Sequence, residues 1–184
     1  MVSLGQLWLP ILLAAVACHL TGFLMWVLLP HHHSDFSAVP DENAVRNLLK
    51  GKLAPGLYTV PHGTHKEMMS PEMVAKRNEG PNLFLTVLPN GVGNMGIQQV
   101  KNVLFHAFVS LLIAYIGCHA LPIGTSYLGV FRIVATAGIL AYATSWGHAT
   151  IWFGKPRAVG MKDALDGVVM ALVTAGIFGA LWPR

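Results

Sequence analysis

Four apolar stretches dominate the hydrophobic pattern of this chain: residues 7–29, 97–120, 127–146 and 165–182. An α-helix rises about 1.5 Å per residue and the hydrocarbon core of a bilayer is about 30 Å thick, so about 20 apolar residues span it. Each stretch reaches or approaches that length. The pattern therefore predicts an all-α membrane protein, folded as a bundle of four transmembrane helices.

The first stretch is interpreted as a retained span rather than a signal peptide. No positively charged residue precedes it, and its apolar run is longer than the about 7–15 residues of a signal-peptide core. The predicted organisation is a first span within residues 1–29, an extramembrane insert over 30–96, and a three-span membrane region over 97–184.

The insert has the pattern of a small α+β unit. Asp41 and Ser70 are N-cap residues placed before helix-forming segments, and Ser70 is followed by Pro71 at the first helical position. Short runs rich in β-branched and aromatic residues follow each predicted helix. The expected elements are helices over residues 41–51 and 70–80 and strands over 57–60 and 82–88.

Composition supports the membrane interpretation. Hydrophobic residues make up 54% of the chain and charged residues 11%, whereas a soluble domain has about 25% charged residues. This excludes most soluble enzymes. The net charge of +4 comes from basic residues beside the spans, which favours anionic lipid headgroups over nucleic acid as their partner.

Charge also predicts the orientation. The insert and the connection over residues 147–160 carry eight of the twelve lysines and arginines, and Lys101 and Lys162 lie at the adjacent edges of the spans. Positively charged loops stay in the cytoplasm. We therefore expect both termini outside and the 30–96 insert in the cytoplasm, most simply in a bacterial inner membrane.

Polar residues inside the spans are the candidate site. A charge at the bilayer centre costs about 2.5–3.5 kcal/mol on insertion scales, so each such residue needs a partner or a purpose. His19 and His106 lie at similar depth in the cytoplasmic half of the membrane, and Asp166 and Tyr142 lie toward the same side.

Four interpretations of these residues stay open. The two histidines bind a b-type haem, or they hold a metal ion with Asp166. Alternatively His106, Tyr142 and Asp166 form a proton relay or a polar head-group site. The simplest interpretation is that each is hydrogen-bonded within the bundle and only specifies packing. The sequence itself requires no cofactor.

Arg132 stands apart, near the outer end of the third span, where no carboxylate is available. Its side chain extends to lipid phosphates, bonds backbone carbonyls, or pairs with an acid of another subunit. The first alternative makes it a lipid contact, and the last makes it a partner contact and indicates assembly.

Further histidines and methionines flank the membrane. His31, His32 and His33 directly follow the first span, and at the membrane surface they could sense pH. Imidazoles here and imidazoles with thioethers in the insert are a weak signal for copper or zinc, and the simpler interpretation is a polar loop or interfacial role. The metal candidates of the insert are His62, His65, Met68 and Met69.

The last span has a stripe of small residues, which lets helix backbones approach closely. The spacing of four residues places them on one face, packed either within the chain or against another molecule: Gly167, Ala171, Ala175 and Gly179.

The sequence has no phosphate-binding, dinucleotide-binding, zincin or hydrolase motif. The resulting hypothesis is a non-catalytic accessory or scaffold subunit of a larger respiratory or photosynthetic membrane complex. Its partners would be the bilayer and other membrane subunits, not nucleic acid. The alternative is a small redox, metal-binding or transport protein that uses His19, His106 and Asp166.

Overall fold

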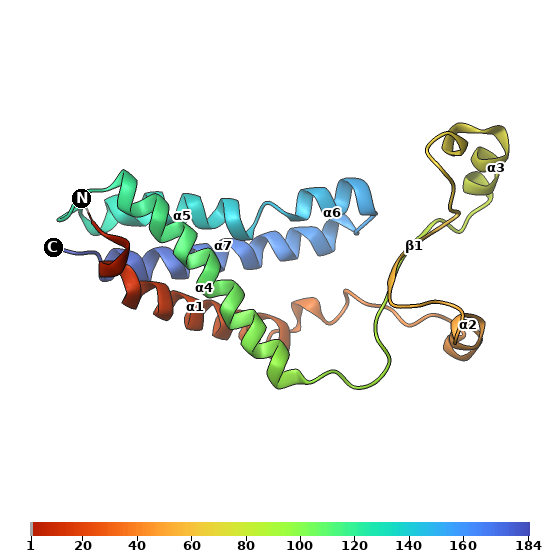
Figure 1. Ribbon diagram of the computed structural model, residues 1–184, viewed down its shortest axis with the longest axis horizontal. Coiled ribbons are helices and arrows are strands. Elements are labelled where there is room, and N and C mark those ends of the chain that lie inside the picture. Colours follow the sequence, from red (N-terminus) through yellow and green to blue (C-terminus); the bar gives the residue numbers. More distant parts are fainter. Residues whose placement is uncertain (1) are drawn as a thin grey trace. The chain divides into compact units, whose positions relative to one another are not determined.

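The structure, a computed structural model, describes residues 2–184 and is mostly helical (Figure 1). The chain forms two compact units. The first, the helical unit, contains the residues up to Phe36 together with Asn94–Arg184. The second, the insert unit, is Ser37–Gly93. Each unit is described by itself.

Four helices of the helical unit are long and apolar enough to cross a membrane, as predicted. The first consists of α1, a 3₁₀ turn before it and a π-helical turn after it. The third is interrupted between α5 and α6. The bounds of the helices are α1 Trp8–Phe23, α4 Met95–Ala120, α5 Tyr127–Tyr142, α6 Trp146–Phe153 and α7 Arg157–Ala180, and the whole first span is Leu4–Leu28.

Two span boundaries differ from the prediction. Helix α7 begins at Arg157, well before residue 165, because its first turns carry charged residues that a search for apolar runs leaves out. The stretch over 147–160, expected as a connection, is largely helical, because it contains most of α6 and the first turn of α7. Helix α6 is capped by Gly154, which has a left-handed φ of +68°. Lys162 and Asp163 are therefore helical residues.

The most extensive helix contact is that of α5 with α7, which run side by side in Figure 1. The small-residue stripe lies in this interface, where Ala171 and Ala175 are fully buried. A Cβ added at Gly167 would lie 2.6 Å from the backbone oxygen of Tyr142. The absence of a side chain there is what allows the two backbones to approach.

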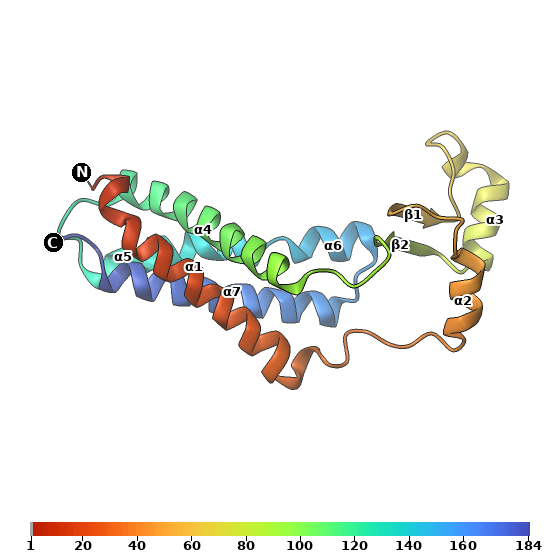
Figure 2. The same cartoon turned by 60° about the horizontal axis from the view of Figure 1, so that its bottom comes forward.

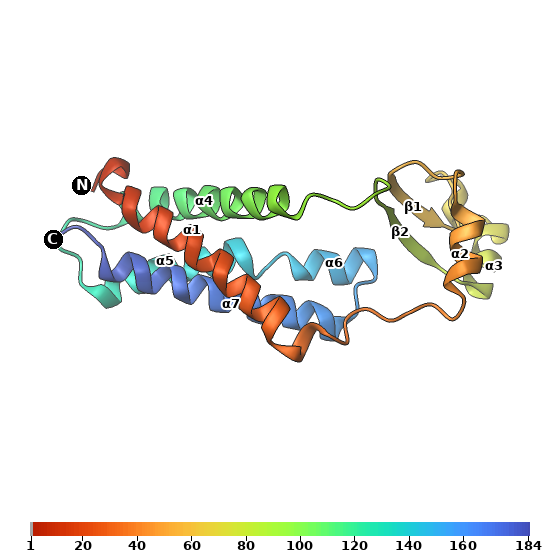
Figure 3. The same ribbon diagram turned by 90° about the horizontal axis from the view of Figure 1, so that it is seen from below.

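Helix α1 packs against both α4 and α7, and it crosses α7 obliquely (Figure 3). Side chains from all of these helices form one buried apolar core, which includes Leu7, Val109, Ile113, Val134 and Phe178. The apolar residues that face away from this core are exposed, as lipid-facing side chains of a membrane protein would be.

The insert unit has the predicted order of helix, strand, helix, strand. The two strands pair antiparallel, with Gly56 opposite Val87 (Figure 2). Both predicted N-caps are confirmed: Asp41 accepts a hydrogen bond from the N–H of Ala44 at 2.8 Å, and Ser70 accepts one from that of Met73 at 3.2 Å. The bounds are α2 Glu42–Leu49, β1 Gly56–Val60, α3 Pro71–Glu79 and β2 Leu83–Val87.

The insert unit buries little of its own apolar surface. Met73 is its buried hydrophobic side chain among the described residues, while Leu57 is 81% and Leu88 72% exposed. A unit of this size has little core to hold it together. Its exposed leucines form an apolar surface, and covering this surface with another molecule or with the membrane would be energetically favourable.

Candidate metal centre and neighbouring polar sites

A sharp change of backbone at the end of the first span presents two imidazoles to α7. Leu29, which precedes a proline, is extended with ψ 138°, because the proline ring disfavours a helical residue before it. Pro30 then opens a 3₁₀ turn over Pro30–His32. This turn directs His31 and His32 toward Asp166 in α7, more than 130 residues later in the chain.

The three side chains form a compact group, the His31–His32–Asp166 cluster. His31 Nε2 lies 3.1 Å from Asp166 Oδ1, and His32 Nε2 lies 2.8 Å from Asp166 Oδ2. One donor atom from each residue falls within 4.8 Å of the others. His32 and Asp166 are each 4% exposed, so this polar contact is made away from bulk water.

A second layer of contacts fixes the orientation of His32. Its Nδ1 lies 2.5 Å from Asp35 Oδ2, and Lys162 Nζ donates to Asp35 Oδ1 at 2.5 Å. The indole of Trp26 stacks on the imidazole with a centroid distance of 3.9 Å and an interplanar angle of 7°. The ring is therefore held at both nitrogens and on one face.

These contacts set the charges of the cluster. Burial alone would lower the pKa of His32, but hydrogen bonds to Asp35 and Asp166 outweigh it and raise the pKa above its ordinary value. Hydrogen bonds from Lys162 and His32 lower the pKa of Asp35. Both ring nitrogens of His32 face carboxylate oxygens, which only accept when ionised, and this favours the imidazolium form of the ring.

The cluster has two chemical capacities. Without a metal it is an ion-paired link between the end of the first span and α7. With a metal, two imidazole nitrogens and one carboxylate are a donor set that suits zinc or iron. Asp35 would then be the outer carboxylate that orients a histidine ligand, an arrangement typical of protein metal sites.

The predicted intramembrane site is divided by the structure. Asp166 pairs with His31 and His32 and has no hydrogen bond to His19 or His106 among residues 2–184. His106 and Tyr142 are neighbours, with ring centroids 5.6 Å apart. His19 Nδ1 lies 3.2 Å from Asn102 Nδ2.

His19 and His106 line one pocket of about 330 Å³ between α1, α4 and α7. His106 is 4% exposed, and its Nδ1 is buried with no hydrogen-bond partner in the described chain. The hydroxyls of Ser110 and Tyr142 are in the same condition. Haem ligation by the two histidines stays a prediction.

Arg132 lies on the exposed side of α5. Its guanidinium has no ion pair or hydrogen bond with the part of the chain that the structure describes. Its side chain thus points to whatever surrounds the helical unit.

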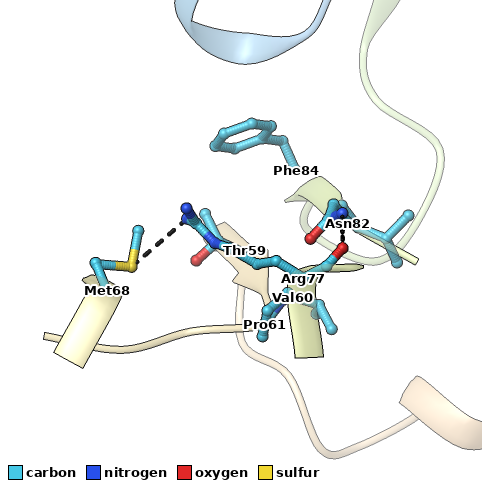
Figure 4. A pocket seen from close by; sticks show the side chains of 8 residues that line it. Thr59, Val60, Pro61, Met68, Arg77, Asn82 and Phe84 are labelled. Atoms are coloured by element: carbon cyan, nitrogen blue, oxygen red, sulfur yellow. Dashed lines mark hydrogen bonds between the residues drawn. The ribbon is translucent and has the colours of Figure 1, made fainter. Parts of the chain in front are cut away.

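The His62–Met69 group does not form a comparable cluster. The ring of His62 lies 3.3 Å from Thr59 Oγ1, and Met69 is 83% exposed. The sulfur of Met68 accepts a hydrogen bond from Arg77 at 3.5 Å (Figure 4). His65 is exposed. Arg77 and Met68 instead border a pocket of about 360 Å³ beside the strands, which Asn82 and Phe84 also line.

Sequence reasoning noted His31, His32 and Asp166 separately and did not join them. The joining signal was available: Asp166 is an acid placed toward one end of its span, and His31 and His32 follow the end of the first span that was predicted to lie on the same side. Asp35 and Lys162 gave no such signal, because each is an ordinary residue for a polar connection.

The chain matches no protein-family model, and no curated protein or solved structure is significantly similar to it.

Proposed function

We propose that this chain is an integral membrane protein that binds a divalent transition-metal ion through His31, His32 and Asp166. The observation that carries the proposal is the convergence of three buried or half-buried metal-ligating groups, with donor atoms within 4.8 Å, from two segments far apart in the sequence. The further contact of His32 with Asp35 at 2.5 Å supports a ligand whose orientation is fixed in advance.

The donor set narrows the metal and its role. Two nitrogens and one oxygen favour zinc, iron or a similar ion over calcium and magnesium, which take oxygen ligands. Three protein ligands leave a coordination position for water or another exchangeable ligand, as in catalytic rather than structural zinc sites. The metal ion would act there as a Lewis acid or be transferred to another molecule.

The test is zinc binding by the full chain purified in detergent, with metal content measured by mass spectrometry and affinity by competition with a chelating dye. Wild type is expected to bind one zinc ion. His31→Ala, His32→Ala and Asp166→Asn each remove a ligand and are expected to weaken binding by at least 10-fold.

His33→Ala is the matched control. It removes an adjacent imidazole that is exposed and whose ring has no hydrogen bond within residues 2–184, so binding should be unchanged. If wild type binds no zinc while Asp166→Asn lowers only the melting temperature, the cluster is an ion-paired link and the metal proposal is wrong.

The membrane arrangement is part of the proposal. Four helices would cross the bilayer as one bundle, with both termini outside and the insert in the cytoplasm, which places the metal at the cytoplasmic surface. A reporter enzyme that is active only on the non-cytoplasmic side of the membrane should be active when fused after Arg184 and inactive when inserted at Gly80. The reverse result would place the metal on the outer face.

A role as an accessory subunit of a larger membrane complex is a second candidate. It is supported by the unpaired guanidinium of Arg132 on the exposed side of α5 and by the exposed leucines of the insert unit. Native gel electrophoresis of solubilised membranes would show the chain in a large assembly, and Arg132→Ala would release it. Migration of the wild-type chain alone would exclude this role.

A further inference from the structure

The pocket between α1 and α4 has a polar wall inside a membrane span. Gln99, Asn102 and His106 follow one face of α4 at spacings of three and four residues, and His19 faces them from α1. Polar side chains within a span are costly unless they meet other polar groups. His19 Nδ1 and Asn102 Nδ2 already lie 3.2 Å apart, and the other polar groups of the wall are left to meet a polar occupant.

The rest of the wall is apolar and aromatic. Phe23 and Trp26 come from the end of the first span, and Met170 comes from α7. Gly22 also lines the pocket and packs closely on Met170, because a Cβ there would lie 3.2 Å from the terminal methyl of Met170. Phe23 is 48% exposed, so this side of the pocket borders the lipid-facing surface.

The charges exclude several occupants. The wall contains no lysine, arginine, aspartate or glutamate, so nothing in it would neutralise a phosphate or a cation. Its polar groups are amides and imidazoles, and an amide nitrogen donates hydrogen bonds to carbonyl oxygens. The occupant therefore has an uncharged, oxygen-bearing head.

His106 supplies a second, independent observation. It is 4% exposed and lines the pocket, and its Nδ1 has no hydrogen-bond partner among the described residues. Buried polar atoms in folded proteins are nearly always hydrogen-bonded, so His106 adds an unsatisfied nitrogen to the polar side of the pocket.

We propose that this pocket binds the ring-shaped head of a lipid-soluble quinone. The quinone carbonyls would accept hydrogen bonds from the amides and imidazoles, the ring would pack on Phe23 and Trp26, and the isoprenoid tail would leave toward lipid. A pocket of about 330 Å³ suits one ring-shaped head, being at the small end of ligand sites, which hold about 300–1,000 Å³.

Trp26 belongs to both sites, because its indole lines the pocket and stacks on His32. The quinone site is nevertheless a separate proposal, since none of its residues is one of the three metal-binding groups. Its test uses protein freed of metal with EDTA, so the outcome does not depend on whether zinc binds.

The test measures binding of decylubiquinone to the full chain in phosphatidylcholine nanodiscs, by quenching of tryptophan fluorescence and by extraction of the retained quinone. Removing two donors with Gln99→Leu and Asn102→Leu together is expected to weaken binding about 10- to 30-fold, at roughly 1 kcal/mol per hydrogen bond. Gln98→Leu, one position away and outside the pocket, should leave binding unchanged.

A second pair of variants tests the space instead of the donors. Gly22→Leu fills the pocket and should abolish binding, whereas Gly5→Leu, where a Cβ would meet nothing within 4 Å, should not. Size-exclusion elution checks that each variant is folded. Wild-type affinity in Gly22→Leu or in the double donor variant, or displacement of the quinone by phosphatidylglycerol, would overturn the proposal.

Discussion

At the scale of single residues, Asp35 orients the His31–His32–Asp166 cluster although it is not one of the three proposed metal ligands. It holds His32 through Nδ1 at 2.5 Å and is itself held by Lys162. Such outer carboxylates fix the ring orientation and make the ligating nitrogen more basic. The metal affinity should therefore depend on a residue that does not touch the metal.

Asp35→Asn is expected to weaken zinc binding by about 10- to 100-fold. The carboxylate accepts from the imidazole and from Lys162 through two oxygens, whereas the amide has only one accepting oxygen. Competition with a chelating dye measures it. Ser34→Ala is the control, since it removes only the exposed hydroxyl that accepts from Lys162. Equal affinity in Asp35→Asn and wild type would mean that His32 needs no orienting partner.

The pH dependence of stability follows from two titratable side chains, those of His32 in the cluster and of its partner Asp35. The raised pKa of His32 gives the metal-free fold a contribution that is complete below the ordinary value of 6.5 and is lost as the pH rises through the raised pKa. The lowered pKa of Asp35 gives one that is present above its ordinary 3.8 and is lost as the pH falls through the lowered pKa.

Zinc should stabilise the fold more as the pH rises, opposite to the loss described for His32, because zinc binds the deprotonated imidazole. The melting temperature with zinc minus that with EDTA is expected to grow as the pH rises from slightly acidic to slightly alkaline. A difference that stays constant over this interval would show that zinc does not compete with the His32 proton.

At the scale of helices, the contact between α5 and α7 depends on residues without side chains. A Cβ at Gly167 would lie 2.6 Å from the Tyr142 oxygen and 2.7 Å from Ala143 Cα, both of them backbone atoms that cannot turn away. Inserting even a methyl group into such an interface forces the two helices apart.

Gly167→Ala is therefore expected to lower the free energy of unfolding by roughly 1–3 kcal/mol, measured by thermal unfolding in detergent. Gly176→Ala in the same helix is the control, because the nearest atom to its Cβ would be the Tyr127 hydroxyl at an ordinary 3.7 Å. If both variants unfold alike, the interface is looser than the structure describes.

The helices and strands themselves were largely predictable from local signals. Apolar runs gave the four long helices, and the N-caps Asp41 and Ser70 marked the starts of α2 and α3. The start of α7 was not predictable in this way, because a search for apolar runs leaves out charged residues such as Lys162 and Asp163. The pairing of His31 and His32 with Asp166 joins residues more than 130 positions apart in the chain, so local signals do not predict it.

At the scale of the whole molecule, all groups proposed to hold the metal belong to the helical unit. His31, His32 and Asp35 precede Phe36, and Lys162 and Asp166 lie in α7, so the insert unit provides none of these contacts. The proposed metal site and the insert unit are then separable, and the exposed leucines of the insert unit are free for the proposed partner.

Replacing Ser37–Gly93 by a flexible glycine–serine linker should leave zinc affinity within a factor of about three of the full chain, because a linker in this surface connection costs mainly loop entropy. Two linker lengths exclude strain as a cause of any loss, and the same replacement with His32→Ala is the control that should bind no zinc. If both linker variants fold but lose zinc, the insert unit supplies a ligand, and the site extends beyond the His31–His32–Asp166 cluster. If the zinc affinity stays and a large assembly seen on native gels disappears, the two units divide metal binding and partner binding between them.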